Sequence, residues 1–587
     1  MSTRPTLVEE KKDISVEGPK VKMTGAQIFL KTLEDLGVDT IFGYPGGVLL
    51  YVYDEIFKQD KIKHILVRHE QGATHMADGY ARVTGRAGVC LATSGPGATN
   101  TVTGLATAMM DSVPMVCFTG QVPVQLIGND AFQEADIVGI TRPCTKHNYL
   151  VKDVNDLERI IHQAFYIATT GRPGPVLVDI PKDVTLATAE YKGLKGVNMR
   201  GYKPQVVTAA GPMEKAIDLI YESQRPVLYM GGGILASGAS DLVRQFAEKL
   251  NLPVGITLMG LGGFPGAHEL SMGMIGMHGG YWANMAMNNA DLLIALGPRF
   301  DDRVTGDTKK FAVKAKKIHL DIDASSIGKN IAVDVPLVGD ARQVLEKLLK
   351  IVDQNPERAK KYRDSISEWH GQIKKWREEH PIYYPQDMKG ELRPQYVIQK
   401  IYDVTGGECI VTTDVGQHQM WTAQIFPFNK PRKWCTSGGL GTMGYGLPAA
   451  LGAQMAHPNE TVFCISGDGS IQMNIQELAT AVQYKLPVKT AIINNFYLGM
   501  VRQWQEYFYG HRYSESDMSP GMPDFVKLAE AYGAVGLLCN KPQDVEAVLK
   551  EALKVKKPVL IDFQVAKEEN VLPMVPAGKA LDDMLLA

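Results

Sequence analysis

The chain repeats parts of itself, and this repetition restricts the folds open to it more than any other feature of the sequence. A stretch that begins Asn155-Asp-Leu-Glu and leads to Pro175-Val-Leu-Val-Asp-Ile180 is similar to a C-terminal stretch that begins Gln543-Asp-Val-Glu and leads to Pro558-Val-Leu-Ile-Asp-Phe563. Acidic residues favour a helix N-terminus, and proline followed by β-branched apolar residues favours a buried strand. Both stretches therefore predict a helix followed by a strand.

A second pair of similar segments occurs in the same order along the chain. Gly79-Tyr-Ala precedes Val89-Cys-Leu-Ala-Thr-Ser-Gly-Pro-Gly97, and Gly444-Tyr-Gly precedes Val462-Phe-Cys-Ile-Ser-Gly-Asp-Gly469. A weaker third copy of the first pattern ends at Arg225-Pro-Val-Leu-Tyr229. Because two similarities keep the same order, the sequence predicts that the first and last domains are related.

Apolar runs without alternation, such as residues 462–465 and 559–562, are typical of parallel strands covered by helices on both faces. The predicted fold class is therefore α/β, with three doubly wound parallel-sheet domains. A polar stretch at 192–211 and a charged stretch at 353–394, with Trp369 and Trp376 at helical spacing, separate them. The predicted division is a disordered N-terminal arm (1–20), a first domain (21–190), a central domain (205–345), a charged connecting helix and linker (353–393), a last domain (394–565) and a C-terminal tail (566–587).

Composition excludes several classes of function. The net charge of −2 offers no electrostatic footprint for nucleic acid or an anionic membrane. No apolar stretch approaches the roughly 18 residues of a membrane span. The first 20 residues are polar, and the seven cysteines are scattered without a Cys-x-x-Cys pair. We expect reduced thiols and a cytoplasmic protein, or an organellar one whose transit peptide has been removed.

The most specific chemical signal is Gly467-Asp468-Gly469-Ser470, followed after one more apolar run by the pair Asn494-Asn495. Both motifs come where a buried strand is predicted to end, and the carboxyl ends of parallel strands line the ligand crevice. A carboxylate and an amide oxygen suit Mg²⁺, and the glycines let the main chain approach a diphosphate. A lone Gly-Asp-Gly is usually a simple turn, but this spacing to Asn495 resembles the thiamine diphosphate (ThDP) binding motif.

The ThDP family also needs a carboxylate against the aminopyrimidine ring, supplied by the related domain. Ile65-Leu-Val-Arg-His-Glu70 reads as a short strand that ends in such a carboxylate. Taken alone, Glu70 is more simply a solvated strand end. The resemblance implies that Glu70 favours the imino tautomer of the ring, which removes the thiazolium proton and yields the ylid that attacks a 2-keto acid.

Further segments spread over the chain from about residue 21 resemble the catalytic subunits of the acetohydroxyacid (acetolactate) synthase family. They are Gly43-Tyr-Pro-Gly-Gly47, Asp130-Ala-Phe-Gln-Glu134, Thr145-Lys-His-Asn148, Gly276-Met-His-Gly279, Arg299-Phe-Asp-Asp-Arg-Val-Thr-Gly306 and Leu498-Gly-Met-Val-Arg-Gln-Trp504. The resemblance implies condensation of pyruvate with a second pyruvate or with 2-ketobutyrate, the first common step of valine, leucine and isoleucine biosynthesis. It also implies a homodimer or homotetramer, with a small regulatory subunit left open.

The resemblance assigns residues to the ThDP site and to catalysis. The catalytic residues are Glu70, Gln133, Lys146 and Gly47. The ThDP contacts are Glu70, Pro45, Gly416, Gln417, His418, Gly441, Met443, Gly467, Asp468, Gly469, Ser470, Asn495, Tyr497, Gly499 and Met500. The Mg²⁺ ligands are Asp468, Asn495 and the main-chain carbonyl of Tyr497. One departure is visible, because Phe496-Tyr497 stands where the family pattern has a polar pair.

The central domain carries a weaker signal for a nucleotide. Residues 231–233 are glycines after an apolar run, and His319-Leu-Asp-Ile-Asp323 ends another run with carboxylates, but the Gly-x-Gly-x-x-Gly spacing is absent. The family resemblance implies FAD here; the alternative is a degenerate domain that has lost its ligand. The implied FAD contacts are Arg172, Gly231, Gly232, Gly233, Thr257, Leu258, Met277, His278, Gly279, Arg299, Asp301, Arg303, Asp321, Ile322 and Asp340.

Substrate selection is assigned to Arg303 and Trp504, with Phe132, Met500 and Val415 as further walls. Arginine can hold the carboxylate of the second keto acid by a bidentate contact, and tryptophan can favour an ethyl over a methyl group. The plainer interpretations are a surface salt bridge for Arg303 and core packing for Trp504. Two rival functions stay open: another ThDP and FAD enzyme such as a pyruvate oxidase, and a non-catalytic flavin- or nucleotide-binding scaffold.

Overall fold

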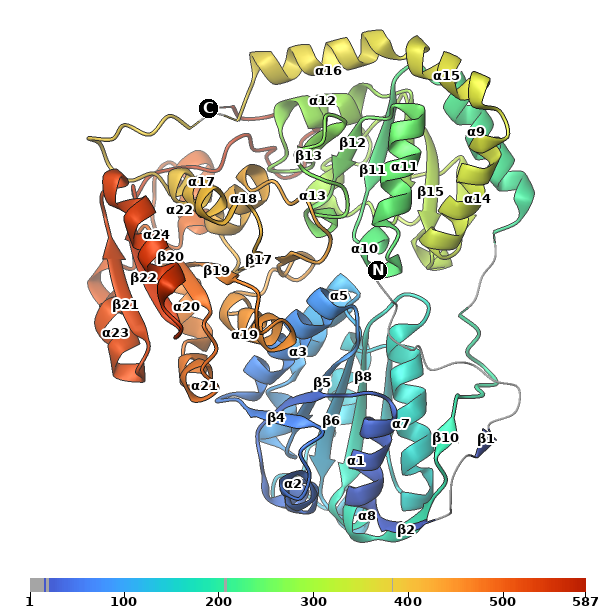
Figure 1. The fold of residues 1–587 in the computed structure, drawn as a ribbon, viewed down its shortest axis with the longest axis vertical. Coiled ribbons are helices and arrows are strands. Elements are labelled where there is room, and N and C mark those ends of the chain that lie inside the picture. The colour runs from blue at the N-terminus through green and yellow to red at the C-terminus, as the bar shows by residue number, and fades with distance from the viewer. Residues whose placement is uncertain (1–14, 17–20, 205–207, 383, 587) are drawn as a thin grey trace.

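The computed structural model describes residues 15–16, 21–204, 208–382 and 384–586. Three six-stranded parallel sheets dominate this part of the chain. In Figure 1 the first domain (blue to cyan), the central domain (green to yellow) and the last domain (orange to red) meet around a common centre. The predicted α/β class with three parallel-sheet domains is confirmed.

The first sheet has the order β4-β3-β5-β6-β8-β7. Its strands are β3 (Thr40–Gly43), β4 (Lys63–Leu66), β5 (Gly88–Ala92), β6 (Met115–Gln121), β7 (His147–Leu150) and β8 (Pro175–Pro181). Its helices are α1 (Gly25–Asp35), α2 (Leu50–Phe57), α3 (Glu70–Thr84), α4 (Pro96–Thr99), α5 (Val102–Asp111), α6 (Ile137–Thr141), α7 (Val154–Thr169) and α8 (Lys182–Leu186). Every residue of β5, β6 and β8 is buried, as expected for strands covered on both faces.

The last sheet has the order β18-β17-β19-β20-β22-β21. Its strands are β17 (Ile410–Thr413), β18 (Trp434–Cys435), β19 (Val462–Gly467), β20 (Lys489–Asn494), β21 (Val535–Cys539) and β22 (Val559–Gln564). Its helices are α17 (Pro394–Thr405), α18 (Gln417–Ile425), α19 (Gly446–Ala456), α20 (Asp468–Ile471), α21 (Glu477–Gln483), α22 (Gly499–Phe508), α23 (Phe525–Tyr532) and α24 (Val545–Lys554).

The first and last domains have the same topology. When the six strands of each sheet are counted along the chain, both orders read 2-1-3-4-6-5. The first pair of similar segments forms α7–β8 and α24–β22, and the second pair leads to β5 and β19, so each pair lies at the same step of the two domains. The predicted relation of these domains is confirmed. The weaker third copy forms α9–β11, which opens a differently ordered sheet.

The central sheet has the order β13-β12-β11-β14-β15-β16, or 3-2-1-4-5-6 along its own strands. This order belongs to folds that bind dinucleotides. The strands are β11 (Pro226–Met230), β12 (Val254–Ile256), β13 (Ser271–Met274), β14 (Leu292–Leu296), β15 (Lys316–Asp321) and β16 (Val335–Val338). The helices are α9 (Ala210–Glu222), α10 (Gly233–Ser237), α11 (Ser240–Leu250), α12 (Tyr281–Asn289), α13 (Asp302–Thr305) and α14 (Ala341–Asp353).

The segment expected as one charged connecting helix forms two, α15 (Pro356–Ser365) and α16 (Ser367–Glu379). They meet at Ile366, which is fully buried. α16 also packs on the central domain, because Trp369 is buried and its Nε1 donates to the Pro226 carbonyl at 3.0 Å. Apolar anchors therefore fix a segment whose charge pattern indicated a solvated linker.

Most of the expected N-terminal arm (1–20) lies outside the described residues. Its described part, β1 (Ser15–Val16), pairs with β10 (Leu194–Lys195), and β2 (Val21–Thr24) pairs with β9 (Thr188–Tyr191). The C-terminal tail crosses to the central domain, where the Val575 N–H donates to the Met277 carbonyl at 2.8 Å. Within the described ranges, none of the helices has the length and apolarity needed to cross a membrane.

Helices α3 and α19 hold the first and last domains of one chain together. The helices approach so closely that a Cβ on Gly79 would collide with the main chain of Ala449, and one on Gly452 would collide with that of Met76. Glycine at these two positions lets the helix backbones touch. α3 begins at Glu70 and α19 belongs to the related domain, so this contact fixes the two repeated halves relative to each other.

Candidate active site

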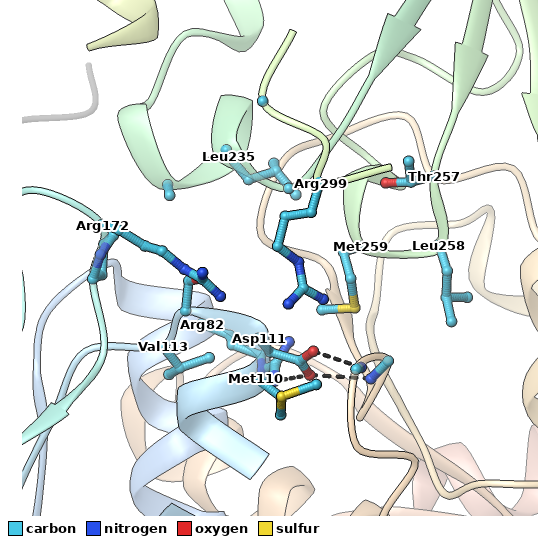
Figure 2. Close-up of a pocket in the computed structure, with 18 of the residues that line it drawn as sticks. Arg82, Met110, Asp111, Val113, Arg172, Leu235, Thr257, Leu258, Met259 and Arg299 are labelled. Carbon is cyan, nitrogen blue, oxygen red and sulfur yellow. Dashed lines mark hydrogen bonds and ion pairs between the residues drawn. The ribbon is translucent and has the colours of Figure 1, made fainter. Parts of the chain in front are cut away.

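A large cavity lies where the three domains meet. Its volume is about 1550 Å³, and residues of the first, central and last domains line it. Figure 2 shows Arg172 of the first domain and Arg299 of the central domain extending into it. Cofactor and substrate sites commonly occupy such spaces between domains.

The central-domain wall of the cavity lies where the strand order of that sheet reverses. β11 and β14 are neighbours there, and the loops after them, residues 231–233 and 297–299, run against each other. A Cβ on Gly231 would lie 2.6 Å from the Pro298 Cα, so this close approach requires glycine. Open α/β sheets bind ligands in the crevice at this reversal. The central domain therefore has the crevice that a dinucleotide needs.

Two guanidinium groups enter this crevice from different domains. Arg172 Nε donates to Ser112 Oγ at 2.8 Å, and its Nη1 lies 3.7 Å from the Asp323 carboxylate. Burial and the neighbouring positive charge of Arg299 lower the pKa of Arg172. Like charges held this close favour an anion between them. The pair suits the phosphates of a dinucleotide.

Most residues assigned to the flavin line the cavity. They are Arg172, Gly232, Gly233, Thr257, Leu258, Met277, His278, Arg299, Asp301, Arg303, Asp321, Ile322 and Asp340. Gly231 and Gly279 do not; Gly279 permits close packing, since its Cβ would lie 2.7 Å from Ile275. The buried Nδ1 of His278 has no partner among the described residues, and burial raises the pKa of Asp321 to about 6. Such polar groups on a cavity wall fit a polar ligand.

The residues assigned to substrate selection divide between the cavity and the surface. Arg303, Trp504, Met500 and Val415 line the cavity. Phe132 does not: it lies on a loop of the first domain with 88% of its surface exposed. In a single chain these five side chains are therefore not brought together.

The plainer interpretations of Arg303 and Trp504 find little support. Arg303 Nε lies 4.0 Å from the Asp302 carboxylate, and both side chains are exposed, so this ion pair contributes little to stability. Trp504 is half-buried rather than part of the core, and its ring lies 5.0 Å from that of Phe508. Both side chains are available to a molecule in the cavity.

A second polar site lies at the carboxyl ends of β19 and β20. α20 begins at Asp468, a buried residue whose Oδ1 accepts the Gly469 N–H at 3.0 Å. Its Oδ2 is buried and has no partner among the described residues. Burial raises the pKa of Asp468 to about 7. A buried carboxylate with one unused oxygen is costly unless a cation or a proton satisfies it.

Asn495 follows β20 directly and completes the predicted metal pair. Its Oδ1 accepts the Tyr497 N–H at 3.2 Å, and its Nδ2 donates to Gln417 Oε1 at 3.1 Å. A Cβ on Gly499 would lie 2.7 Å from Asn495 Nδ2, so glycine keeps this position clear. The buried Nε2 of His418 has no partner in the described part of the chain. These groups form a polar cradle around Asp468.

The cradle has the composition of a magnesium–diphosphate site rather than of a site built from protein ligands alone. In the described residues, no three His, Cys, Asp or Glu side chains are grouped to hold a metal. Mg²⁺ usually takes one or two protein oxygens and completes its shell with phosphate oxygens and water. Asp468 and Asn495 fit that pattern.

Glu70 lies on the first domain, at the corresponding edge of the related sheet. It begins α3, is 8% exposed, and its Oε2 accepts from Asn100 Nδ2 at 2.9 Å. Pro45 and Gly47 lie exposed in the loop after β3. Neither Glu70 nor Asp468 lines the large cavity. Gly416, Gly441, Met443 and Met500 of the expected ThDP site do line it, so in one chain the cavity takes in part of that site without its two carboxylates.

The other two residues assigned to catalysis also lie away from the cavity. Gln133 has a left-handed backbone (φ 60°) in the loop that carries Phe132. Lys146 Nζ donates to the carbonyls of Ile167 and Thr170, where α7 ends, and burial lowers its pKa to about 8. In this conformation Lys146 satisfies helix carbonyls. Catalytic roles for both residues stay predictions.

Sequence inspection missed a charged contact on the floor of the cavity. Asp111, at the end of α5, accepts the N–H groups of Gly438 and Gly439 at 3.0 and 2.7 Å, and Arg82 Nη2 donates to it at 2.8 Å (Figure 2). This contact fixes the loop that leads to Gly441, a residue assigned to ThDP. No local pattern marks Asp111, because its two main-chain partners lie in the last domain and Arg82 lies on another helix.

The chain matches three family profiles in order. They are described as the thiamine pyrophosphate enzyme N-terminal TPP binding domain (residues 23–140), central domain (213–348) and C-terminal TPP binding domain (414–563). The first and last cover Glu70 and Asp468, respectively. The central match covers the sheet with the dinucleotide-binding order.

Whole-chain relatives carry a more specific name. The chain is 49% identical to the acetolactate synthase isozyme 3 large subunit of Escherichia coli (strain K12), over 96% of this chain and 99% of the relative. It is 48% identical to the acetolactate synthase large subunit of Haemophilus influenzae (96% and 98%). It is 50% identical to that of Corynebacterium glutamicum (96% and 90%).

Proposed function

The chain belongs to the acetolactate synthase large-subunit family of thiamine pyrophosphate enzymes, and we propose that the Asp468 cradle, Glu70 and the central cavity together form its active site. Its activity is that of an acetolactate synthase in branched-chain amino-acid biosynthesis. The substrates proposed are two pyruvates, or pyruvate and 2-ketobutyrate.

The single observation that carries the site assignment is the unused oxygen of Asp468. This Oδ2 is buried, has no partner in the described residues and follows β19, the strand that pairs with the one before Asn495, so Asp468 and Asn495 would hold Mg²⁺ here. The main-chain carbonyl of Tyr497 is the third proposed ligand. Bound there, ThDP would supply an acidic thiazolium C–H group, the source of the nucleophile for 2-keto acids. Glu70 would hold a proton at the pyrimidine ring nitrogen and so promote loss of the separate thiazolium proton.

We propose that the site is completed by a second copy of the chain. Glu70 and Asp468 do not share the cavity of one chain, and the edge around Glu70 exposes apolar side chains that a partner would cover. These include Tyr44, Leu50, Leu126 and Phe132. A homodimer is then the minimal active unit, and a homotetramer is equally compatible with it.

FAD is the ligand proposed for the central cavity. The 3-2-1-4-5-6 strand order, the glycine-lined crevice and the Arg172–Arg299 pair support a dinucleotide there. The flavin residues would bind and orient the cofactor, which the condensation does not need as an oxidant.

Arg303 and Trp504 are proposed to select the second substrate from the wall of the same cavity. Arg303 would bind its carboxylate, and Trp504 would contact the methyl or ethyl group. Since the relatives are named large subunits, we also propose a small regulatory subunit as partner and a cytoplasmic location.

The test is a product assay of the purified chain with pyruvate, ThDP, Mg²⁺ and FAD. Acetolactate should form without oxygen consumption. Oxygen uptake coupled to pyruvate decarboxylation would indicate a pyruvate oxidase, and absence of any product with bound flavin would indicate a scaffold. A mixture with 2-ketobutyrate should also give 2-aceto-2-hydroxybutyrate.

A further inference from the structure

A carboxylate from the last domain lies at the start of the helix that carries Glu70. Glu477, the first residue of α21, is fully buried. Its Oε1 accepts the N–H groups of Arg68 and His69, each at 3.0 Å, and its Oε2 accepts from Thr480 Oγ1 at 2.7 Å. The two N–H groups precede Glu70 directly, at the positive end of α3. Glu477 thus acts as a cap supplied by another domain.

The rest of α21 contacts the same turn. The Leu66 N–H donates to Tyr484 Oη at 2.8 Å, and Thr480 Oγ1 contacts the Leu66 carbonyl at 3.3 Å. A Cβ on Gly72 would lie 2.5 Å from Glu477 Oε1, so the first turn of α3 is shaped to admit this carboxylate. Figure 1 shows α21 beside the end of β4. The turn between β4 and α3 is therefore positioned by the last domain rather than by its own.

The Glu70 side chain itself has little to fix it. One carboxylate oxygen accepts from Asn100 Nδ2, and no other hydrogen bond to the Glu70 side chain is present among the described residues. Its position must then depend mainly on where its backbone begins α3. Displacements of about 1 Å at a reacting group can lower a rate by about 100-fold.

A reciprocal contact joins the same two domains, with the carboxylate supplied by the first domain. Asp111 of the first domain, whose side chain is fully buried, accepts two consecutive N–H groups, of Gly438 and Gly439, in the loop that leads to α19. Each related domain thus gives one buried carboxylate to the main chain that precedes a helix of the other.

We propose that Glu477 is a positioning residue for Glu70. By capping the N–H groups of Arg68 and His69, it sets where α3 begins and so where the Glu70 carboxylate stands relative to the pyrimidine ring. The inference rests on the proposed catalytic role of Glu70. The competing explanation is that Glu477 only stabilises the contact between the domains.

The test is the exchange rate of the thiazolium proton, followed by NMR in holoenzyme saturated with ThDP and Mg²⁺. Glu477→Ala leaves two N–H groups without their acceptor and should lower the rate by about 10- to 100-fold. In a Glu70→Gln background the same change should lower it no further, because Glu477 acts through Glu70. Burial raises the pKa of Glu477 to about 7, so Glu477→Gln should mimic the carboxyl group and restore most of the rate. If the alanine variant does not fold, Glu477→Asp, which draws the carboxylate back by one methylene, takes its place in the comparison with and without Glu70→Gln.

A matched control separates positioning from stability. Glu158 is also buried and accepts two main-chain N–H groups, of Lys192 and Leu194 at 3.0 and 2.7 Å, away from either half of the site. Glu158→Ala should lower the melting temperature and leave the exchange rate unchanged. The inference is overturned by an equal fall in rate in this control, by additive effects in the double variant, or by a normal rate in Glu477→Ala. If Glu70→Gln itself exchanges normally, the catalytic role of Glu70 fails first, a result distinct from failure of Glu477 alone.

Discussion

The first and last domains share one topology but present different chemistry at the same place. In both, a four-residue helix follows the third strand; α4 begins at Pro96, and α20 begins at Asp468. In both, the last strand carries an aspartate bonded to the neighbouring strand, Asp179 to Thr119 at 2.7 Å and Asp562 to Asn494 at 2.9 Å. The residues that support the scaffold are retained, whereas the residue proposed to meet the ligand is not.

With the site assigned as proposed, this difference gives a reason for two copies of one fold in one reaction. A carboxylate at the position of Asp468 can hold a metal and its diphosphate, and the proline at the same position in the first domain cannot. The first domain instead offers Glu70, at the start of the helix after its second strand. Duplication gives two similar edges, and the proposed assignment divides acid–base and metal-binding roles between them through substitution at a few positions.

Substitution of Asp468 should have the largest effect, and the equivalent Pro96 of the first domain provides the control. Asp468→Ala removes the only charged protein ligand proposed for Mg²⁺ and should weaken ThDP binding by about 100-fold or more, since even indirect partners of a metal cost about 10- to 100-fold. Titration of activity with ThDP at fixed Mg²⁺ measures this, and high concentrations of both should restore part of the activity. Pro96→Ala is the matched control and should leave the affinity unchanged. Wild-type affinity in Asp468→Ala would contradict the division of roles.

A smaller effect is expected at Trp504, on α22 of the last domain. One methylene in an apolar pocket is worth about 10- to 200-fold in discrimination, so Trp504→Leu should reduce the preference for 2-ketobutyrate over pyruvate by about that factor. Competition between both keto acids, with both products quantified, measures the ratio. Arg303→Ala should weaken both acceptors alike, because both carry the same carboxylate. An unchanged product ratio in Trp504→Leu would show that Trp504 packs against its neighbours without selecting the substrate.

The smallest effect on activity is expected at the shared aspartates, which should instead affect stability. Burial raises the pKa of Asp179 to about 7, and burial also raises that of Asp562. Since the folded pKa exceeds the unfolded one, the carboxyl group of Asp179 contributes its full stability below about pH 4 and loses it as the pH rises to about 7. Asp179→Asn should therefore remove a loss of stability over this range of up to about 4 kcal/mol. Urea unfolding at both ends of the range tests this, and an unchanged slope would show that Asp179 does not titrate there.

Local sequence patterns were sufficient for the parts of the site that lie on one segment. Gly467-Asp468-Gly469 and Asn495 could be predicted because strand ends and turn residues mark them. The relation of the two domains followed from similar segments in the same order. Neither Asp111 nor Glu477 could be recognised, because each accepts main-chain N–H groups that belong to the other domain. The helical spacing of Trp369 was visible, but the burial of Ile366 and Trp369 was not, because two apolar anchors outweigh the charge of the stretch around them.

Mixing two inactive variants tests the central claim most directly. At ThDP and Mg²⁺ concentrations that saturate only the wild-type site, Glu70→Gln and Asp468→Ala chains should each be nearly inactive alone. When equal amounts are dissociated and reassembled, they should regain about a quarter of wild-type activity, since half of the dimers are mixed and each has one intact site. This result is expected if Glu70 of one copy serves the Asp468 cradle of another. If both residues served one site within a single chain, every site in the mixture would lack one of them, and the mixture would stay as inactive as its components.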